Sequence, residues 1–281
     1  MGHKQLINEV KSQAALSNSQ SVVFTFEPHP VQVLFPERKL KRLFPREDQI
    51  EQLELFGMDF LVVEPFSRAL SQTPPFEFLE SYILKPLNPE SLVVGYDFSF
   101  GANRQGGVEM LEEFSKKHGL KIKIIPPFEV GGVVASSTRI RRAIVEGEID
   151  LANCLLGRRF YLQGLVEKGD RRGTKIGFPT ANLASLTECI PKKGVYATRT
   201  LIKGQRFKSV TNIGTNPTFL DSEDVRVETH ILDFDQFIYG QEIRVEFADR
   251  LRDEKKFSSI DELKAQIKKD AEQARSHVEL G

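Results

Sequence analysis

In the first half of the chain, short apolar runs alternate with amphipathic stretches. The apolar runs predict buried strands over residues 21–26, 60–63, 91–94 and 121–125. Apolar positions spaced three and four residues apart, with suitable end residues, predict helices over residues 4–16, 45–57, 76–84, 107–118 and 136–145. Strands alternating with helices are typical of a Rossmann-like α/β fold with a mostly parallel, doubly wound sheet. Such sheets bind ligands beyond the carboxyl ends of their strands.

After Leu156, turn residues instead of helices separate the strand-like runs. These runs cover residues 160–166, 195–202, 207–213, 226–234 and 242–247. Their spacing predicts a small antiparallel barrel. The chain closes on a helix that can begin with a capping box at Ser259–Glu262, with one apolar face formed by Ile260, Leu263, Ile267 and Ala274. We therefore predict two domains, residues 1–156 and residues 157–281.

Length and composition limit the possible classes of protein. A chain of 281 residues can form two domains, and its 39 basic and 39 acidic side chains leave no net charge to attract nucleic acid or an anionic membrane. Cys154 and Cys189 have no metal-binding or redox spacing and are expected to be reduced thiols. The apolar runs are strand length, and the first 15 residues lack a signal-peptide core. These features predict a cytoplasmic protein with no nucleic-acid or membrane partner.

The segment 169–182 combines three glycines with three basic side chains and a Thr/Asn pair. Glycines let backbone amides approach an anion, and arginine or lysine neutralises phosphate charge. The side-chain oxygens of Thr180 and Asn182 are of the kind that fill part of a magnesium shell beside phosphates. A solvated basic hairpin loop remains the alternative. The candidate nucleotide-binding residues are Gly169, Asp170, Arg171, Gly173, Lys175, Thr180 and Asn182.

Glu228 lies within an alternating strand-like run and allows two interpretations. On the inner face of a barrel, a carboxylate would need a functional reason, such as acting as a general base on a substrate hydroxyl. On the outer face, it would be a solvated glutamate paired with Arg226. Periodicity alone favours the second interpretation, the solvated glutamate, and leaves the first one open.

Several motifs of the second half occur together in one known family. The second half resembles the riboflavin kinase module in sequence and in order, at Gly164, Gly169, Asp170 and Gly173 and at residues 177–182, 194–197, 212–219, 228–240 and 252–257. The resemblance begins near Gly157 and implies a six-stranded barrel that transfers the γ-phosphate of ATP to the 5′-hydroxyl of riboflavin. It also implies that Thr180 and Asn182 bind the magnesium nucleotide and that Glu228 is the catalytic base. Arg252 and Phe257 would bind the flavin.

The first half resembles an FMN adenylyltransferase of the nucleotidyltransferase type. The matching segments are residues 24–30, 94–106 and 136–141. The whole chain is therefore similar to the prokaryotic bifunctional riboflavin kinase/FAD synthetase family, with ATP, riboflavin and FMN as substrates and Mg²⁺ or another divalent cation as cofactor. Helix-start amides near Ser137 and Thr138, with Arg141, would hold ATP phosphates. Pro28, Pro30 and Asp97 would line the flavin side, whereas His29 is expected to be held in a turn.

The first residues depart from the pattern of that family. The family opens with a strand and a motif with two histidines, whereas this chain begins Met1-Gly2-His3-Lys4 and keeps only the final Gly-His. His3 is thus the remaining catalytic histidine that the resemblance implies. Because the first strand of such a sheet is usually central, we expect unpaired strand edges beside its position. We favour a true start upstream of Met1 over an impaired adenylyltransferase.

The sequence leaves three functions to separate. The first is a bifunctional enzyme, and the second is a riboflavin kinase with a degraded first domain. The third is a non-enzymatic flavin or nucleotide sensor. The presence of Glu228, Thr180 and Asn182 counts against the sensor, because a sensor needs no general base.

Overall fold

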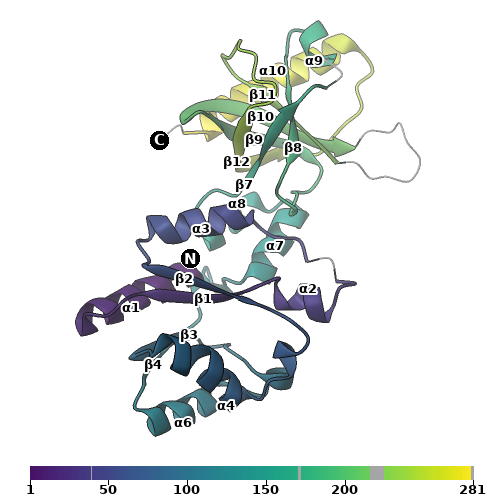
Figure 1. Ribbon diagram of the computed structural model, residues 1–281. Coiled ribbons are helices and arrows are strands. Elements are labelled where there is room, and N and C mark those ends of the chain that lie inside the picture. Colours follow the sequence, from purple (N-terminus) through teal and green to yellow (C-terminus); the bar gives the residue numbers. More distant parts are fainter. Residues whose placement is uncertain (39, 170–171, 216–224, 280–281) are drawn as a thin grey trace. The chain divides into compact units, whose positions relative to one another are not determined.

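The computed structural model describes residues 1–38, 40–169, 172–215 and 225–279 (Figure 1). By internal contacts the chain divides into two units, the first formed by Met1–Lys41 and Arg46–Ala135 and the second by Arg42–Pro45 and Ser136–Gly281. Asp170, Arg171 and the motif residues 217–219 lie outside the described residues. The predicted boundary at Leu156–Gly157 separates two functional domains and not two contact units, and it stays a prediction.

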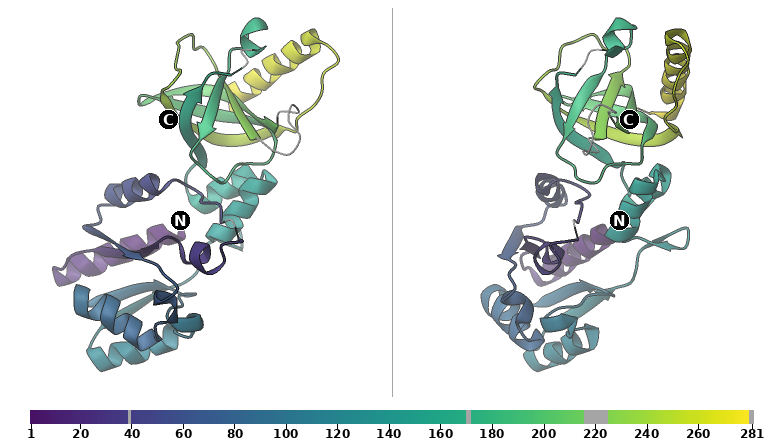
Figure 2. Two further views of the ribbon diagram at one scale, coloured as in Figure 1. Left: turned by 45° about the vertical axis from the view of Figure 1, so that its right-hand side comes forward. Right: turned by 90° about the vertical axis from the view of Figure 1, so that its right-hand side faces the viewer.

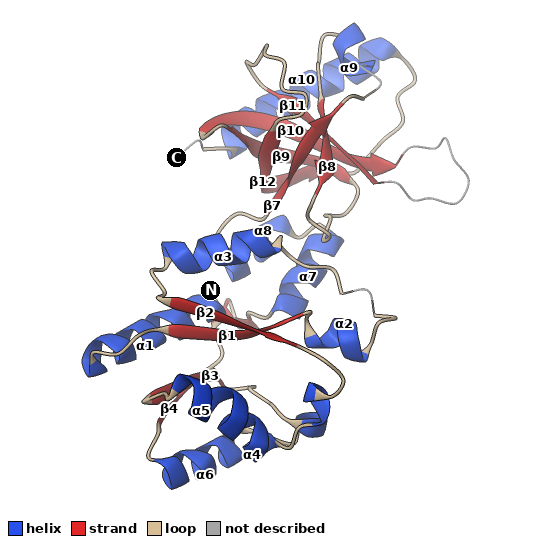
Figure 3. Cartoon of the chain, viewed as in Figure 1, coloured by secondary structure: helices blue, strands red, loops and turns tan. Residues whose placement is uncertain are grey.

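The first unit contains two pairs of parallel strands. β1 (Val22–Glu27) pairs with β2 (Phe60–Pro65), and β3 (Ser91–Gly95) pairs with β4 (Lys121–Ile125). The predicted α/β class with parallel strands is thus confirmed. In the described part of this unit, however, the four strands form two separate pairs instead of one continuous sheet (Figure 3). β1 and β3 each hydrogen-bond to one strand, which agrees with the expected unpaired edges.

Helices surround these strands, and the four helical segments predicted in this unit are among them. Their bounds are α1 Gly2–Ser17, α2 Pro30–Leu34, α3 Arg46–Leu55, η1 Leu70–Gln72, α4 Pro75–Phe78, η2 Leu79–Leu84, α5 Lys85–Leu87, η3 Ala102–Arg104 and α6 Val108–His118. A short hairpin of β5 (Glu129–Val130) and β6 (Val133–Val134) follows. Gly119 ends α6 at φ 69°, a left-handed conformation that glycine adopts without strain. The core of this unit contains Leu79, Leu111 and Phe114, which belong to a cluster packed with apolar side chains of β1, β3 and β4.

The second unit is built around a closed barrel of six antiparallel strands. The strand order is β10-β11-β8-β7-β12-β9. The bounds are β7 Tyr161–Glu167, β8 Ala181–Ser185, β9 Gly194–Ile202, β10 Gln205–Thr215, β11 Val225–Ile231 and β12 Glu242–Arg252. The hydrophobic pattern predicted five of these strands and missed β8, whose first two residues belong to the glycine-rich segment 169–182. The six-stranded barrel implied by the family resemblance is confirmed.

The interior of the barrel combines apolar side chains with a group of buried hydroxyls. Phe247, Val245 and Leu162 fill the side formed by β7 and β12. On the other side, five buried hydroxyls of β9, β10 and β11 form a continuous chain in the order Thr200, Ser209, Thr198, Thr211 and Thr229. Their oxygens lie 2.8–3.0 Å apart, so each buried hydroxyl has a partner. This chain ties together the registers of three strands.

The remaining helices of the second unit lie outside the barrel. They are α7 Ser137–Glu146, α8 Ile149–Leu156, α9 Arg172–Lys175 and α10 Ile260–His277. The predicted start of α10 is confirmed, because Ser259 caps the helix by accepting a hydrogen bond from the Glu262 amide at 3.1 Å. Ala274 of α10 packs on Val195 and Val210 of the barrel. Figure 2 shows α10, in yellow, lying along the outside of the barrel. Ile260 was expected on this face but is 61% exposed, since the packed stripe begins further along the helix.

Candidate functional site

Three polar side chains form a row across neighbouring strands of the barrel. Asn182 on β8 lies directly opposite Glu228 on β11, and Glu228 lies directly opposite Asn212 on β10. Residues directly opposite in an antiparallel pair point to the same face, with Cβ atoms about 4.5–5.5 Å apart. The carboxylate therefore stands between two amides. Two of the predicted site residues, Asn182 and Glu228, are thus brought together by strand register.

This row lies on the outer face of the barrel. Val227, Thr229 and Ile231 are buried and point inward, so Glu228 points outward and is half-buried. The inner-face position, which would by itself have required a functional reason, is not observed. The side chain of Arg226 shares the outer face of β11. What distinguishes Glu228 is its position between Asn182 and Asn212.

The glycines of segment 169–182 allow it to fold back over β8. A Cβ on Gly169 would overlap the side-chain amide of Asn182, and one on Gly173 would overlap the carbonyl of Phe178 and contact Thr180. Both positions therefore require glycine for close approach. The backbone amide of Phe178 donates a hydrogen bond to the carbonyl oxygen of Gly173 at 2.9 Å. The predicted residues Gly169, Gly173, Thr180 and Asn182 lie together, whereas Lys175 is exposed on α9.

His230 attaches the end of this segment to β11. Its Nδ1 lies 2.8 Å from the carbonyl oxygen of Pro179, and its ring meets Phe178 edge-on at 5.5 Å. Because a carbonyl only accepts, Nδ1 must carry the proton in this hydrogen bond. His230 is two residues from Glu228 on the same face. The motif that contains it was noticed in the sequence, but no role was assigned to this histidine.

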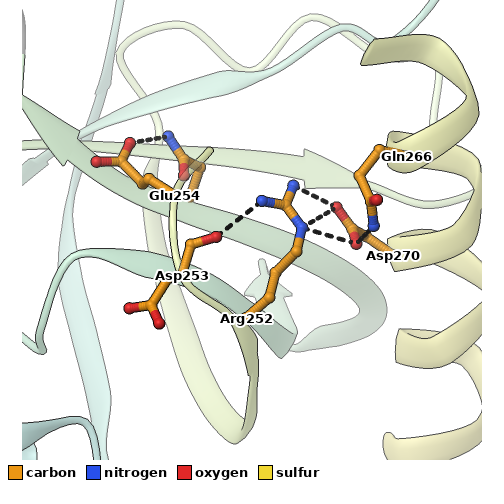
Figure 4. Close-up of polar contacts among 6 residues, drawn as sticks. Arg252, Asp253, Glu254, Gln266 and Asp270 are labelled. Atoms are coloured by element: carbon orange, nitrogen blue, oxygen red, sulfur yellow. Dashed lines mark hydrogen bonds and ion pairs between the residues drawn. The ribbon is translucent and has the colours of Figure 1, made fainter. Parts of the chain in front are cut away.

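The other end of the row meets the segment that follows β12. Asn212 Nδ2 donates to Glu254 Oε1 at 3.4 Å, and a Cβ on Gly214 would overlap the same oxygen. Arg252, two residues earlier, pairs with Asp270 of α10 (Figure 4). The Arg252 guanidinium carbon lies 5.9 Å from the centre of the Phe257 ring. The two predicted flavin-binding residues are therefore neighbours, and their binding role stays a prediction.

Asp270 was also missed, although the sequence carries a signal for it. It lies on the stripe of α10 formed by Leu263, Ile267 and Ala274, where spacings of three and four residues place it toward the barrel. A charged side chain on the apolar stripe of an amphipathic helix indicates a buried, paired carboxylate. The structure confirms that Asp270 is buried, with 1% exposure.

In the first unit, the predicted residues lie near the ends of β1 and β3. The turn after β1 holds Pro28, His29 and Pro30, and His29 caps α2 through its Nδ1, which accepts from the Val31 amide at 3.2 Å. The expectation that His29 is held in a turn is confirmed. Asp97 follows β3 and is exposed.

His3 is close enough to Asp97 for their charges to interact. Its side chain has exposed surface, yet many protein atoms crowd the ring, and this partial burial lowers the pKa of His3. The charge at the amino terminus lowers it further, and the Asp97 carboxylate raises it, so the net direction is down. His3 is thus held in its neutral form more readily than a free histidine.

Ser137, Thr138 and Arg141 lie on α7, in the second unit. Ser136 caps this helix by accepting a hydrogen bond from the Arg139 amide at 3.2 Å, so Ser137 and Thr138 occupy its first turn. Burial lowers the pKa of the Arg141 guanidinium, while the nearby Cys189 raises it. Because His3, Pro28, Pro30 and Asp97 belong to the first unit, their union with these three residues in one site stays a prediction.

Fold and site together define a class: an α/β unit with parallel strands, followed by a six-stranded barrel whose outer face carries a carboxylate between two amides. Family models for FAD synthetase and riboflavin kinase match residues 1–139 and 156–278. Bifunctional riboflavin kinase/FMN adenylyltransferases of Listeria monocytogenes and Bacillus subtilis are 37% and 36% identical, over 98% of this chain and 88% and 87% of their own lengths. The chain belongs to the bifunctional riboflavin kinase/FMN adenylyltransferase family, as its motifs suggested.

A solved structure supports the fold over nearly the full length. A crystal structure of a Streptococcus pneumoniae protein, described as a macrolide-efflux protein, is 34% identical and superimposes with a TM-score of 0.91. The match covers 98% of this chain and 89% of that protein. Among the described residues, no helix combines the length and the apolar character that a membrane crossing needs.

Proposed function

We propose that this protein phosphorylates riboflavin to FMN with ATP and then adenylylates FMN to FAD. The observation that carries the first activity is the row Asn182–Glu228–Asn212, with the glycine-rich segment folded over its Asn182 end. Membership in the family supports both activities and their substrates ATP, riboflavin and FMN. A cytoplasmic location stays part of the proposal.

In the kinase reaction, Glu228 is the general base. It accepts the proton of the riboflavin 5′-hydroxyl while that oxygen forms its bond to the γ-phosphorus and the bond to ADP breaks. The flanking amides of Asn182 and Asn212 orient the carboxylate and the groups beside it. Phosphoryl transfer depends mainly on positioning and charge neutralisation, so one base beside a phosphate-binding segment is sufficient.

The donor set fits a magnesium nucleotide. Mg²⁺ prefers oxygen ligands and usually keeps several waters, with one or two protein oxygens and the substrate phosphates completing its shell. Thr180 and Asn182 offer such oxygens beside Gly169 and Gly173. When bound, the ion neutralises phosphate charge, and these two residues hold it together with the nucleotide.

For adenylyl transfer, the first turn of α7 binds ATP phosphates through backbone amides of Ser137 and Thr138, with Arg141 as a cation. His3 steadies the phosphates, and Pro28, Pro30 and Asp97 line the flavin side. A kinase without adenylyl transfer is the second candidate. The specific observation that favours it is the division of the parallel strands into two separate pairs.

One incubation separates these proposals. The purified chain is mixed with riboflavin, ATP and Mg²⁺, and flavins and nucleotides are separated by chromatography. FMN with ADP, followed by FAD with pyrophosphate, is the expected result. FMN without FAD selects the kinase alone, and unchanged riboflavin refutes both. Omitting the divalent ion is expected to abolish FMN formation.

A further inference from the structure

Asp270 is a buried charge for which α10 alone offers no explanation. It is 1% exposed and lies on the face of the helix that packs against the barrel. Removing a carboxylate from water is costly unless a cation and further hydrogen bonds replace the lost solvation. The residues that pair with Asp270 therefore indicate why a carboxylate is buried at this position.

Arg252 and Gln266 supply the partners (Figure 4). Arg252 Nε donates to both oxygens of Asp270 at 3.1 Å, and its Nη2 donates to Oδ2 at 2.7 Å. Gln266, one turn earlier on α10, donates to Oδ1 at 2.7 Å. Charge-assisted hydrogen bonds of this kind fix the plane of a guanidinium. Asp270 thus determines the orientation of Arg252.

Arg252 ends β12 and controls the direction of the chain beyond it. Its Nη1 donates to the carbonyl oxygen of Asp253 at 3.0 Å. Arg250 donates to the carboxylate of Asp253 at 2.5 Å, so two arginines hold the first residue after the strand. Glu254 then meets Asn212, which lies opposite Glu228. A continuous series of contacts therefore joins Asp270 to the catalytic row.

We propose that Asp270 is a positioning residue for riboflavin phosphorylation. By holding Arg252, it places residues 252–257 beside Asn212 and Glu228, where they form the riboflavin side of the site. This inference rests on the proposed kinase function. The nucleotide side is held by different contacts, those of Asn182 with Gly169 and of His230 with Pro179. Loss of Asp270 should therefore affect riboflavin much more than ATP.

The test is Asp270→Asn, which keeps the shape of the side chain and removes its charge. Because small misplacements of positioning groups have large kinetic effects, we expect the KM for riboflavin to rise roughly ten- to a hundredfold. The KM for ATP should stay within about twofold, since its side of the site is held independently. Asp270→Glu keeps the charge and should recover part of the riboflavin affinity.

Glu246→Gln is the matched control. Glu246 pairs with Arg199 at 2.6 Å, and both side chains are 14% exposed, so this is a second shielded ion pair on the same barrel. Loss of the Glu246 charge should lower the Tm, as loss of the Asp270 charge should. It should leave the KM values for riboflavin and for ATP unchanged. A similar rise in the riboflavin KM for both variants would show a merely structural role. An unchanged riboflavin KM in Asp270→Asn would also overturn the inference.

Two further measurements keep the inference testable. If Asp270→Asn does not fold, Gln266→Leu removes one hydrogen bond from Asp270 and should raise the riboflavin KM alone, by a smaller factor; no change would refute the proposal. Amide hydrogen exchange of residues 253–257 should quicken in Asp270→Asn and not in Glu246→Gln. A wild-type chain that makes no FMN refutes the proposed kinase function. Faster amide exchange in Asp270→Asn would still establish that Asp270 positions residues 253–257.

Discussion

The barrel and the parallel-strand unit organise their candidate sites in different ways. In the barrel every strand has two neighbours, and the row Asn182–Glu228–Asn212 follows directly from backbone pairing. In the first unit β1 and β3 are each paired with one strand, and His3, Pro28 and Asp97 lie at element ends and in loops. A closed sheet fixes its site by register, whereas an open arrangement leaves it to loops.

The largest effect expected from this comparison is at the centre of the row. Glu228→Gln should lower the rate of FMN formation about 10²- to 10⁴-fold, the usual contribution of a general base, and leave riboflavin affinity nearly unchanged. Steady-state kinetics with equilibrium flavin binding measure both. Glu242→Gln, on the outer face of β12, is the control. Retention of more than about a tenth of the rate would remove the assignment of the base.

The glycine-rich segment should be the next most sensitive feature. In Gly169→Ala the new Cβ would overlap the Asn182 amide, so the segment must move and the KM for ATP should rise roughly ten- to a hundredfold. Gly107→Ala is the control, because no atom lies within 4 Å of a Cβ there. Equal ATP affinities in the two variants would contradict the close approach.

The hydroxyl chain tests whether register supports the row. Thr211→Val keeps the shape but breaks the contacts with Thr198 and Thr229. Thr198 keeps its contact with Ser209, whereas Thr229 loses its partner in the hydroxyl chain, and a buried polar group without a partner costs about 1–3 kcal/mol. Chemical unfolding should show a loss of this size together with slower FMN formation. Thr200→Val, which breaks the single contact with Ser209, should cost less. If Thr211→Val loses stability but keeps full activity, the hydroxyl chain does not support the site.

The smallest expected effect concerns the first unit. Because the pKa of His3 is lower in the folded protein than its ordinary 6.5, the unfolded chain binds more protons between these two values. The free energy of unfolding should therefore rise with pH across that window. The contribution linked to His3 is complete above pH 6.5 and is lost as the pH falls through the folded pKa. His3→Gln should flatten this part of the stability profile in thermal unfolding. If the pH dependence of stability keeps the same slope in His3→Gln, a group other than His3 is responsible for it.

Much of the fold could be predicted, and the exceptions have physical causes. The apolar runs located all four parallel strands and five of the six barrel strands, because buried strands need continuous or alternating apolar side chains. β8 escaped because its five residues, Ala-Asn-Leu-Ala-Ser, contain one large apolar side chain, that of Leu183, and so form no apolar run. The separation of the parallel strands into two pairs depends on which strand edges hydrogen-bond to each other. Hydrophobic periodicity does not contain that information.

The same limit applies to the candidate site. Glu228, Thr180 and Asn182 could be found from the residues and from the family resemblance, because chemistry requires those residue types. The outward direction of Glu228 agrees with the interpretation that periodicity favoured, but periodicity could not show that Asn182 and Asn212 flank it. Asp270 carried a readable signal, a charge on an apolar stripe, but its partner Arg252 could not be predicted from spacing.

The sequence by itself determined most of the strands, the longer helices, the glycines at close approaches and the residue types available for chemistry. Those properties are local, since they depend on periodicity, caps and the absence of a Cβ. Only the tertiary structure decided that Asn182, Glu228 and Asn212 stand in one row, that His230 holds Pro179 and that Asp270 reaches the row through Arg252. These contacts join distant segments, and the closure of the barrel sets their register.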